Sequence, residues 1–197
     1  MVLNGAIKMP DHLPEAERSE LLKIARQALE TAVRGQPFPQ LERDQIPSSF
    51  LEPGAVFVTL TRHGELRGCI GALEAYQPLV DDVREHVAAA ALQDYRFPPV
   101  TAEEVAEIKI EISRLTRPTP LSYRDADDLL AKLRPNVDGV ILRDGWRRAT
   151  FLPQVWEKIE SPEEFLSHLC YKMGTSPDLW QHKKLDVSIY QVEEFHE

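Results

Sequence analysis

Residues 56–73 read Val-Phe-Val-Thr-Leu-Thr-Arg-His-Gly-Glu-Leu-Arg-Gly-Cys-Ile-Gly-Ala-Leu, and the rest of the chain is arranged around this stretch. Two runs with the character of β-strands flank residues 62–65, and Gly64 can supply the positive φ that a tight turn requires. The stretch therefore predicts a β-hairpin.

The second arm of this hairpin carries the first candidate site. Side chains alternate between the two faces of a strand, so we expect Arg67, Cys69 and Gly71 on one side. A nearby guanidinium favours the reactive thiolate, and glycine inside a strand is typical of close approach by a backbone or a ligand. Cys69 is thus a candidate nucleophile, and Arg67, Gly68 and Gly71 are candidate ligand-binding residues.

A plainer interpretation of these residues stays open. Cys69 can be a small buried hydrophobe, and Arg67 can be an ion-paired surface residue. A nucleophile also needs a base, and His63, the nearest histidine before Cys69, lies several residues away at the predicted turn.

Other stretches show clear periodicity. Apolar residues recur at helical spacing in residues 14–35, 78–91, 122–133 and 162–173. Residues 108–112 and 187–190 alternate as strands, and residues 140–152 predict a second hairpin that turns at Asp144-Gly145. Residues 36–54 are proline-rich and predict a connection without regular structure.

The two hairpins suggest an internal duplication. Superposing Gly64 on Gly145 aligns Arg67 with Arg148, and each hairpin is followed by an apolar helix and then a strand. We expect a leader over residues 1–20 and a domain over 21–197, with possible half-repeats at about 55–120 and 121–197 sharing one core. Arg148 would then join Arg67 on one anion, since guanidinium groups suit phosphate or carboxylate; arginines facing water are the simpler alternative.

The remaining polar candidates are weaker. Asp94 and Arg96 follow a predicted helix end, where they can line a ligand-binding cleft or form a local ion pair. Cys170 lies on an apolar helical stripe and is expected in the core. The sequence lacks the spacings of zinc sites, phosphate loops and dinucleotide-binding turns, so we expect no metal and no cofactor.

Composition limits the possible partners. The chain has 197 residues and a net charge of −9, which argues against general binding of nucleic acids or anionic membranes. Two widely separated cysteines, with no apolar leader of signal-peptide length and no run of about 20 apolar residues, predict a cytoplasmic protein outside the membrane.

Several blocks of sequence resemble one known family. They are Leu-Arg-Gly-Cys-Ile-Gly at residues 66–71, Asp-x-Arg-Phe-Pro-Pro at 94–99, Ile-Glu-Ile-Ser-Arg-Leu at 110–115 and Ala-Thr-Phe-Leu-Pro-Gln-Val-Trp at 149–156. In this order, and over about residues 21–195, they resemble the AMMECR-type domain. The resemblance implies an α+β fold with a curved, mainly antiparallel sheet covered by helices. Ala72 departs from the threonine often found there.

The resemblance also implies a functional context. The family is similar to protein A of the AmmeMemoRadiSam system, which occurs with a Memo-type protein and a radical S-adenosylmethionine protein. We therefore expect a cytosolic ligand-binding or partner-binding component, with an anionic small molecule as its possible ligand. Two alternatives stay open: a cysteine-dependent enzyme that uses Cys69 for transfer or hydrolysis, and a pure protein-interaction module.

Overall fold

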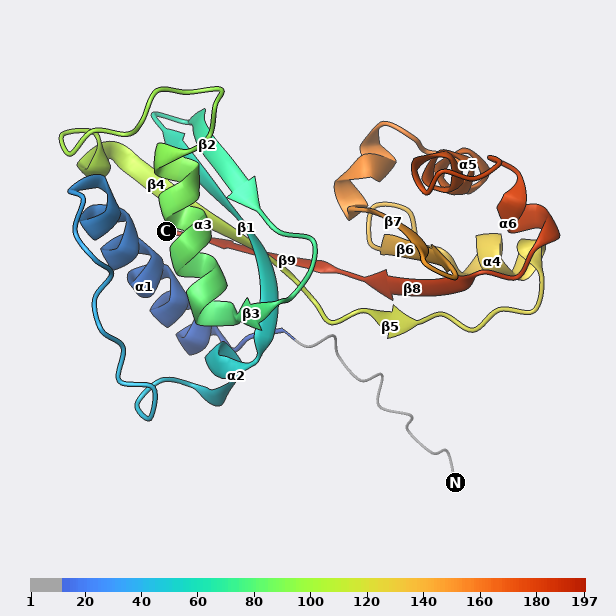
Figure 1. The fold of residues 1–197 in the computed structure, drawn as a ribbon, viewed down its shortest axis with the longest axis horizontal. Coiled ribbons are helices and arrows are strands. Elements are labelled where there is room, and N and C mark those ends of the chain that lie inside the picture. The colour runs from blue at the N-terminus through green and yellow to red at the C-terminus, as the bar shows by residue number, and fades with distance from the viewer. Residues whose placement is uncertain (1–11) are drawn as a thin grey trace. The chain divides into compact units, whose positions relative to one another are not determined.

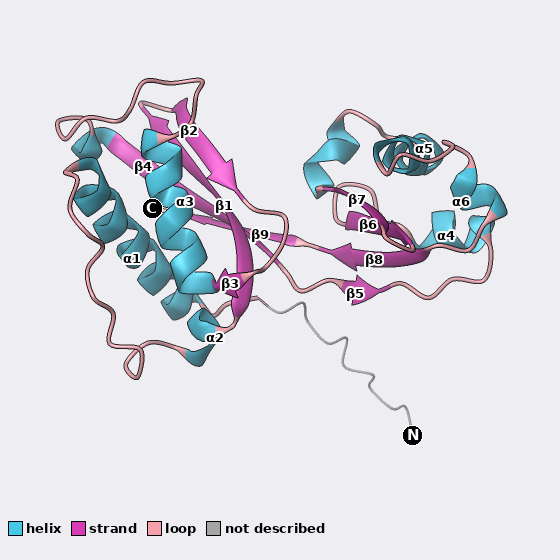
Figure 2. Cartoon of the chain, in the orientation of Figure 1, coloured by secondary structure: helices cyan, strands magenta, loops and turns pink. Residues whose placement is uncertain are grey.

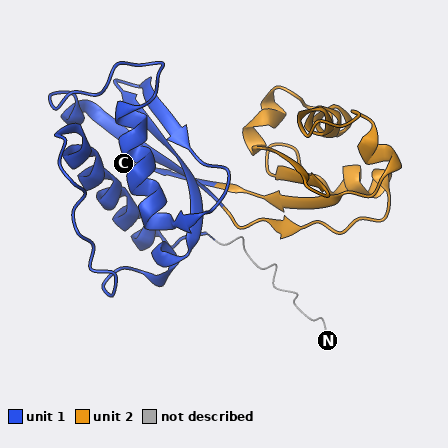
Figure 3. Ribbon diagram, viewed as in Figure 1, with its two compact units in different colours: residues 1–115, 193–197 blue, residues 116–192 orange. Residues whose placement is uncertain are grey.

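The computed structural model describes residues 12–197 (Figure 1). The chain divides into two compact units, of which unit 1 holds residues 1–115 and 193–197 and unit 2 holds residues 116–192 (Figure 3). Unit 1 is therefore discontinuous in sequence. Residues 1–11 of the predicted leader lie outside the described residues, and its later part already enters the first helix.

Unit 1 is built on a mainly antiparallel sheet whose strands follow the order β2-β1-β4-β9, with the short β3 paired to β1. The strands are β1 (Pro53–Arg62), β2 (Glu65–Gly71), β3 (Gln77–Pro78), β4 (Ile108–Leu115) and β9 (Val192–His196). Its helices are α1 (Glu15–Val33), α2 (Ser48–Leu51), α3 (Leu79–Leu92) and the 3₁₀ turn η1 (Val105–Glu107). The long α1 and α3 pack against each other and cover the sheet (Figure 2).

The predicted hairpin is formed by β1 and β2. His63 has a φ of 54° and Gly64 a φ of 85°, so both turn residues adopt the positive φ of a type I′ turn. The pairing runs in one register from Arg62 opposite Glu65 to Thr61 opposite Leu66, and then shifts so that Leu60 lies opposite Gly68. The extra residue in β2 is Arg67, which makes this position a β-bulge.

A buried carboxylate joins α3 to β1. Asp82 is fully buried and accepts a hydrogen bond from the Val56 backbone N–H at 2.9 Å and one from the Gln77 side chain at 3.1 Å. His86 lies one helical turn further along α3, with its Nδ1 3.2 Å from the same carboxylate. Asp82 raises the pKa of His86 by hydrogen bonding.

A second buried carboxylate holds the start of the described chain to β9. Glu193 is only 3% exposed and accepts a hydrogen bond from the Leu13 backbone N–H at 3.1 Å. Its oxygens lie 2.8 Å from Arg18 of α1 and 3.2 Å from Arg114 of β4. Residues 193–197 therefore complete unit 1 through charge pairing as well as through the sheet.

Unit 2 has its own antiparallel sheet in the order β5-β8-β6-β7. The strands are β5 (Thr119–Pro120), β6 (Gly139–Asp144), β7 (Arg147–Phe151) and β8 (Asp186–Tyr190), and the helices are α4 (Ala126–Lys132), η2 (Pro153–Glu157), α5 (Pro162–Lys172) and α6 (Leu179–His182). Trp156 of η2 stacks on Phe165 of α5, with ring centroids 3.6 Å apart, in the centre of its core. At the second hairpin Gly145 takes a φ of 60°, as the first residue of a type II′ turn does.

These features confirm the α+β class and the mainly antiparallel strands expected from the sequence. The strand orders β2-β1-β4 and β7-β6-β8 agree, and in each unit the hairpin is followed by a helix and then by the third strand. The expectation of one shared core is wrong, because the buried residues form two clusters, one on each sheet. The half-repeats at 55–120 and 121–197 stay a prediction.

Candidate functional site

Cys69 lies near the end of β2, an edge strand of the sheet in unit 1. Its sulfur lies 3.3 Å from the hydroxyl of Thr59, the residue directly opposite on β1. Its backbone N–H donates to the Asp94 carboxylate at 2.8 Å, and Arg96 donates to its carbonyl oxygen at 3.3 Å. Two side chains thus bind the edge of the strand at Cys69 in the manner of a neighbouring strand.

Asp94 and Arg96 form a tight ion pair. The Arg96 guanidinium donates to both carboxylate oxygens, at 2.9 and 2.6 Å, and the Arg96 backbone N–H adds a third bond at 3.1 Å. These bonds, with the one from Cys69, hold the pKa of Asp94 well below its ordinary value. The sequence left a cleft and a local ion pair open, and the observed contacts form an ion pair that also binds Cys69.

Arg67 has partners other than Cys69. Its guanidinium binds Glu104 through two nitrogens, each 3.1 Å from an oxygen, and donates to the Pro98 carbonyl at 2.8 Å. Arg62 contacts the same Glu104 at 3.0 Å, and the bond from Arg67 is the main cause that lowers the pKa of Glu104 to about 2. The strict alternation expected for β2 does not hold, because the bulge at Arg67 interrupts it. The guanidinium that contacts Cys69 belongs to Arg96.

The two glycines of β2 have packing explanations. A Cβ at Gly68 would lie 2.1 Å from the Ala90 carbonyl oxygen of α3, and one at Gly71 would lie 2.5 Å from the Cα of Phe57. Of the two causes that the sequence suggested, approach by another part of the chain therefore accounts for both positions. Their role in ligand binding stays a prediction.

The histidine suggested as a base for Cys69 contacts a carboxylate at the hairpin turn. His63, the suggested base, has its Nε2 3.2 Å from Glu107 at the hairpin turn. Cys170 is fully buried in the core of unit 2, and burial raises the pKa of its thiol. Cys170 is therefore a core residue, as its helical position predicts.

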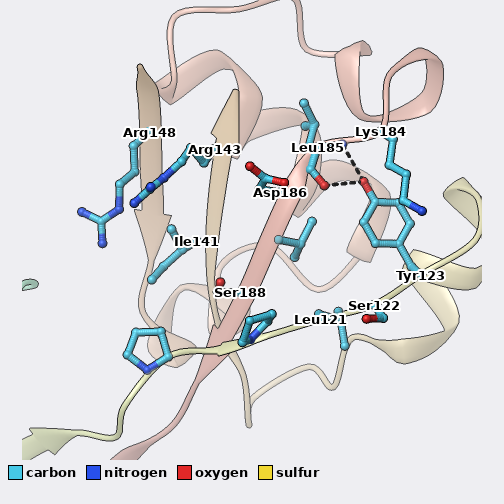
Figure 4. A pocket seen from close by; sticks show the side chains of 13 residues that line it. Leu121, Ser122, Tyr123, Ile141, Arg143, Arg148, Lys184, Leu185, Asp186 and Ser188 are labelled. Carbon is cyan, nitrogen blue, oxygen red and sulfur yellow. Dashed lines mark hydrogen bonds between the residues drawn. The ribbon is translucent and has the colours of Figure 1, made fainter. Parts of the chain in front are cut away.

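Unit 2 contains a cavity of about 540 Å³, which we call the unit 2 pocket (Figure 4). Its charged lining residues are Arg143, Arg148, Lys184 and Asp186. The rest of the lining is apolar or carries hydroxyl groups, and consists of Pro118, Pro120, Leu121, Ser122, Tyr123, Ile141, Leu185, Val187 and Ser188. This volume falls within the range of about 300–1,000 Å³ that small-molecule sites occupy.

Strand alternation places the two arginines in this pocket. On β6, Val140 and Leu142 are fully buried in the core, so Ile141 and Arg143 point to the other face of the sheet. Arg148 of β7 lies directly opposite Arg143 in the pairing, and Asp186 of β8 lies opposite Arg143 on its other side. Three adjacent strands therefore present a row of charges (Figure 4).

Tyr123 and Lys184 form the other end of the unit 2 pocket (Figure 4). The Tyr123 hydroxyl accepts a hydrogen bond from the Leu185 backbone N–H at 2.7 Å and donates to the Leu185 carbonyl at 2.9 Å. Burial raises the pKa of Tyr123, so the phenol stays neutral at physiological pH. The ammonium group of Lys184 lies 5.6 Å from the centre of the Tyr123 ring.

The structure thus distributes the sequence candidates over several places. It brings Cys69, Asp94 and Arg96 together in unit 1. Arg67, which lies on the same strand as Cys69, binds Glu104 instead. Arg148 lines the unit 2 pocket, and its convergence with Arg67 stays a prediction. Sequence reasoning missed Arg143 and Lys184. The alternation around Arg143 was the available signal, whereas Lys184 lies outside the regular strand.

Two kinds of feature are absent from the described residues. Within residues 12–197, histidine, cysteine and acidic side chains form no group of three or more suited to hold a metal ion. No helix in this part of the chain has the length and apolar character that crossing a membrane requires.

Comparison with known proteins identifies the family. The AMMECR1 family model matches residues 22–195. A protein of Methanothermobacter thermautotrophicus is 41% identical over 190 residues, covering 94% of this chain and 96% of that protein. One of Thermofilum pendens is 36% identical over 200 residues, covering 94% and 92%. The crystal structure of uncharacterized protein PH0010 from Pyrococcus horikoshii matches with a TM-score of 0.71 and 31% identity, covering 94% of this chain and 93% of that one. The resemblance found in the sequence blocks is confirmed, and the chain belongs to the AMMECR1 family.

Proposed function

We propose that this protein binds a small organic anion in the unit 2 pocket. The observation that carries the proposal is the lining of one cavity by Arg143, Arg148 and Lys184, in a protein whose net charge is −9. Guanidinium groups bind carboxylate and phosphate with paired hydrogen bonds. The apolar part of the lining suits the organic remainder of such a ligand.

A titration with two small aromatic anions tests this function. Benzoate and phenyl phosphate would be added to the labelled protein while backbone amide signals are followed by NMR. We expect at least one probe to shift the signals of β6, β7 and β8, and Arg148→Gln to weaken its binding about tenfold, since bonds to charged groups contribute about 1.5–3 kcal/mol. The failure of both probes to bind would refute the function.

Arg147→Gln is the matched control for this titration. Arg147 is the neighbour of Arg148 on β7, but it is exposed, stacks on Trp146 at 5.2 Å from the ring centre and does not line the pocket. The proposal requires that this variant binds the probes as the unaltered protein does. Equal weakening by both substitutions would indicate a general effect of surface charge instead of binding in the pocket.

The expected partners are part of the same proposal. We infer from the resemblance to protein A of the AmmeMemoRadiSam system that the protein acts with a Memo-type protein and a radical S-adenosylmethionine protein. Size-exclusion chromatography of the three purified proteins, with and without phenyl phosphate, tests for a complex. Separate elution under both conditions would contradict a stable association.

A cysteine-dependent reaction is the second candidate. It is favoured by the partial exposure of Cys69 and by the bonds that Asp94 and Arg96 make to its backbone. The rate of alkylation of each cysteine, measured by peptide mass spectrometry, tests the accessibility that this role needs. We expect Cys69 to react in the folded protein and the buried Cys170 to react only on unfolding. Equal inertness of both thiols would remove this candidate.

A further inference from the structure

Arg143 and Asp186 place opposite charges side by side in the unit 2 pocket. Arg143 of β6 lies directly opposite Asp186 of β8, and both side chains line the pocket (Figure 4). Both residues are exposed, and among the ion pairs of residues 12–197 there is none between these two. The pocket therefore offers a ligand one guanidinium group and, next to it, one carboxylate.

This arrangement favours a ligand that carries both signs of charge. We propose that the natural ligand is a free α-amino acid with an apolar side chain, an inference that rests on the proposed function. Its carboxylate is the anionic group that the proposed function describes, and the Arg143 guanidinium binds it through paired hydrogen bonds. Its ammonium group donates a charge-assisted hydrogen bond to the Asp186 carboxylate.

The spacing of the two strands suits so compact a ligand. Residues directly opposite each other on paired strands have Cβ atoms about 4.5–5.5 Å apart. In an α-amino acid the carboxylate and the ammonium group are attached to the same carbon atom, so one small ligand can contact Arg143 and Asp186 together. A ligand with a carboxylate alone places its negative charge beside Asp186, which repels it. Such a ligand should therefore bind more weakly than the amino acid.

An apolar surface next to the charged pair accommodates the side chain of the ligand. Ile141 precedes Arg143 by two residues on β6, so it lies about 7 Å along the strand on the same side of the sheet. Pro120 of β5 and Leu121 line the same cavity. An aromatic or branched aliphatic side chain would bury apolar area against these residues. Glycine, which lacks such a side chain, should bind more weakly.

The experiment compares L-phenylalanine with probes that each lack one of its parts. Affinities for L-phenylalanine, hydrocinnamate, phenethylamine and glycine would be measured by calorimetry at about pH 7, where α-carboxyl groups are ionised and α-amino groups are protonated. Hydrocinnamate lacks the ammonium group, phenethylamine lacks the carboxylate, and glycine lacks the aromatic side chain. We expect L-phenylalanine to bind at least about tenfold more tightly than each of the other three, a difference of about 1.4 kcal/mol.

Variants connect this preference to the pocket. Asp186→Asn removes the charged partner of the ammonium group, and we expect it to reduce the preference for L-phenylalanine over hydrocinnamate severalfold. Glu160→Gln removes a negative charge from an exposed residue of unit 2 that does not line the pocket, and it should leave the preference unchanged. Circular dichroism checks that each variant is folded. If Asp186→Asn does not fold, Arg143→Gln gives a second test, because it should reduce the preference for L-phenylalanine over phenethylamine.

The possible outcomes separate this inference from the proposed function. Binding of hydrocinnamate as tightly as L-phenylalanine, or an unchanged preference in folded Asp186→Asn, overturns the amino acid and leaves an anion-binding pocket in place. Equally tight binding of glycine overturns the apolar side chain. Equally tight binding of phenethylamine overturns the inference and also contradicts the proposed function, because no anionic group is then needed. Failure of all four probes while benzoate or phenyl phosphate binds overturns the inference alone.

Discussion

Gly68 sets the distance between α3 and the edge strand. A methyl group at this position would lie 2.1 Å from the Ala90 carbonyl oxygen, which is a backbone atom and cannot rotate away. We predict that Gly68→Ala lowers the free energy of unfolding by about 2–3 kcal/mol, the upper range for overpacking. Urea denaturation measures the change. Leu66→Ala, at an exposed position of the same strand, is the control and should stay within about 0.5 kcal/mol.

At the scale of single residues, the sequence predicted which residues lie on the strand better than it predicted their side-chain contacts. The motif at residues 66–71 marked the right strand, but alternation paired Arg67 with Cys69, whereas Arg67 binds Glu104. A one-residue bulge caused the difference, and no turn or proline in the sequence signals it. Arg96 reaches Cys69 from a loop 27 residues further along the chain, a contact that local periodicity cannot predict.

At the scale of the elements, the stability that α3 contributes to the fold depends on the protonation of His86. The pKa of His86 is raised by Asp82 first and also by the nearby Glu85, against an opposing effect of burial. A raised pKa means that the pair stabilises the fold fully below the unfolded value of about 6.5 and loses this contribution as the pH rises through the folded value. We predict that the stability difference between the unaltered protein and His86→Gln shrinks as the pH rises from about 6.5 upward. A constant difference over this range would contradict the role of the charge.

The protection of the Cys69 amide at the open edge of β2 depends on Asp94. Its carboxylate accepts the Cys69 backbone N–H, a donor that would otherwise face solvent on an unpaired strand edge. We predict that Asp94→Ala makes the Cys69 amide exchange with deuterium faster, while the amide of Leu60 in the interior strand β1 keeps its rate. Because the pKa of Asp94 is depressed, its contribution is present above the ordinary value and is lost only as the pH falls through the lower folded value. Unchanged exchange at Cys69 in the variant would show that the carboxylate does not protect this edge.

For the molecule as a whole, the two core clusters predict separate effects of core substitutions. Phe165 is fully buried in unit 2, between Trp156 and Phe151. Its replacement by alanine should cost about 3–5 kcal/mol, and hydrogen exchange should show lost protection in unit 2 with protection retained in unit 1. Tyr171→Ala, at a 72% exposed position of the same helix, is the control. Equal loss of protection in both units would mean that they unfold as one.

The fold as a whole was largely predictable, and the reasons for the exceptions are physical. Helices α1, α3 and α5 and both hairpins have strong periodicity and turn signals, and all of them were predicted. The short α2, β3, β5 and α6 span too few residues for a periodic pattern to appear. The division into two cores depends on pairing between β4 and β9, which are far apart in sequence, and nothing local in either strand specifies it.

Because unit 1 is discontinuous in sequence, its sheet can be completed only at the end of synthesis. The sheet of unit 1 receives β9 only after the ribosome has made all of residues 116–192, which takes about 4–15 s at about 5–20 residues per second. During this interval the outer edge of β4 lacks its partner, and Arg18 and Arg114 lack the Glu193 carboxylate that they bind in the finished fold. Unit 2, which is continuous in sequence, has all of its strands once β8 (Asp186–Tyr190) is made, just before β9. The unit that begins first on the ribosome is therefore the one that finishes last.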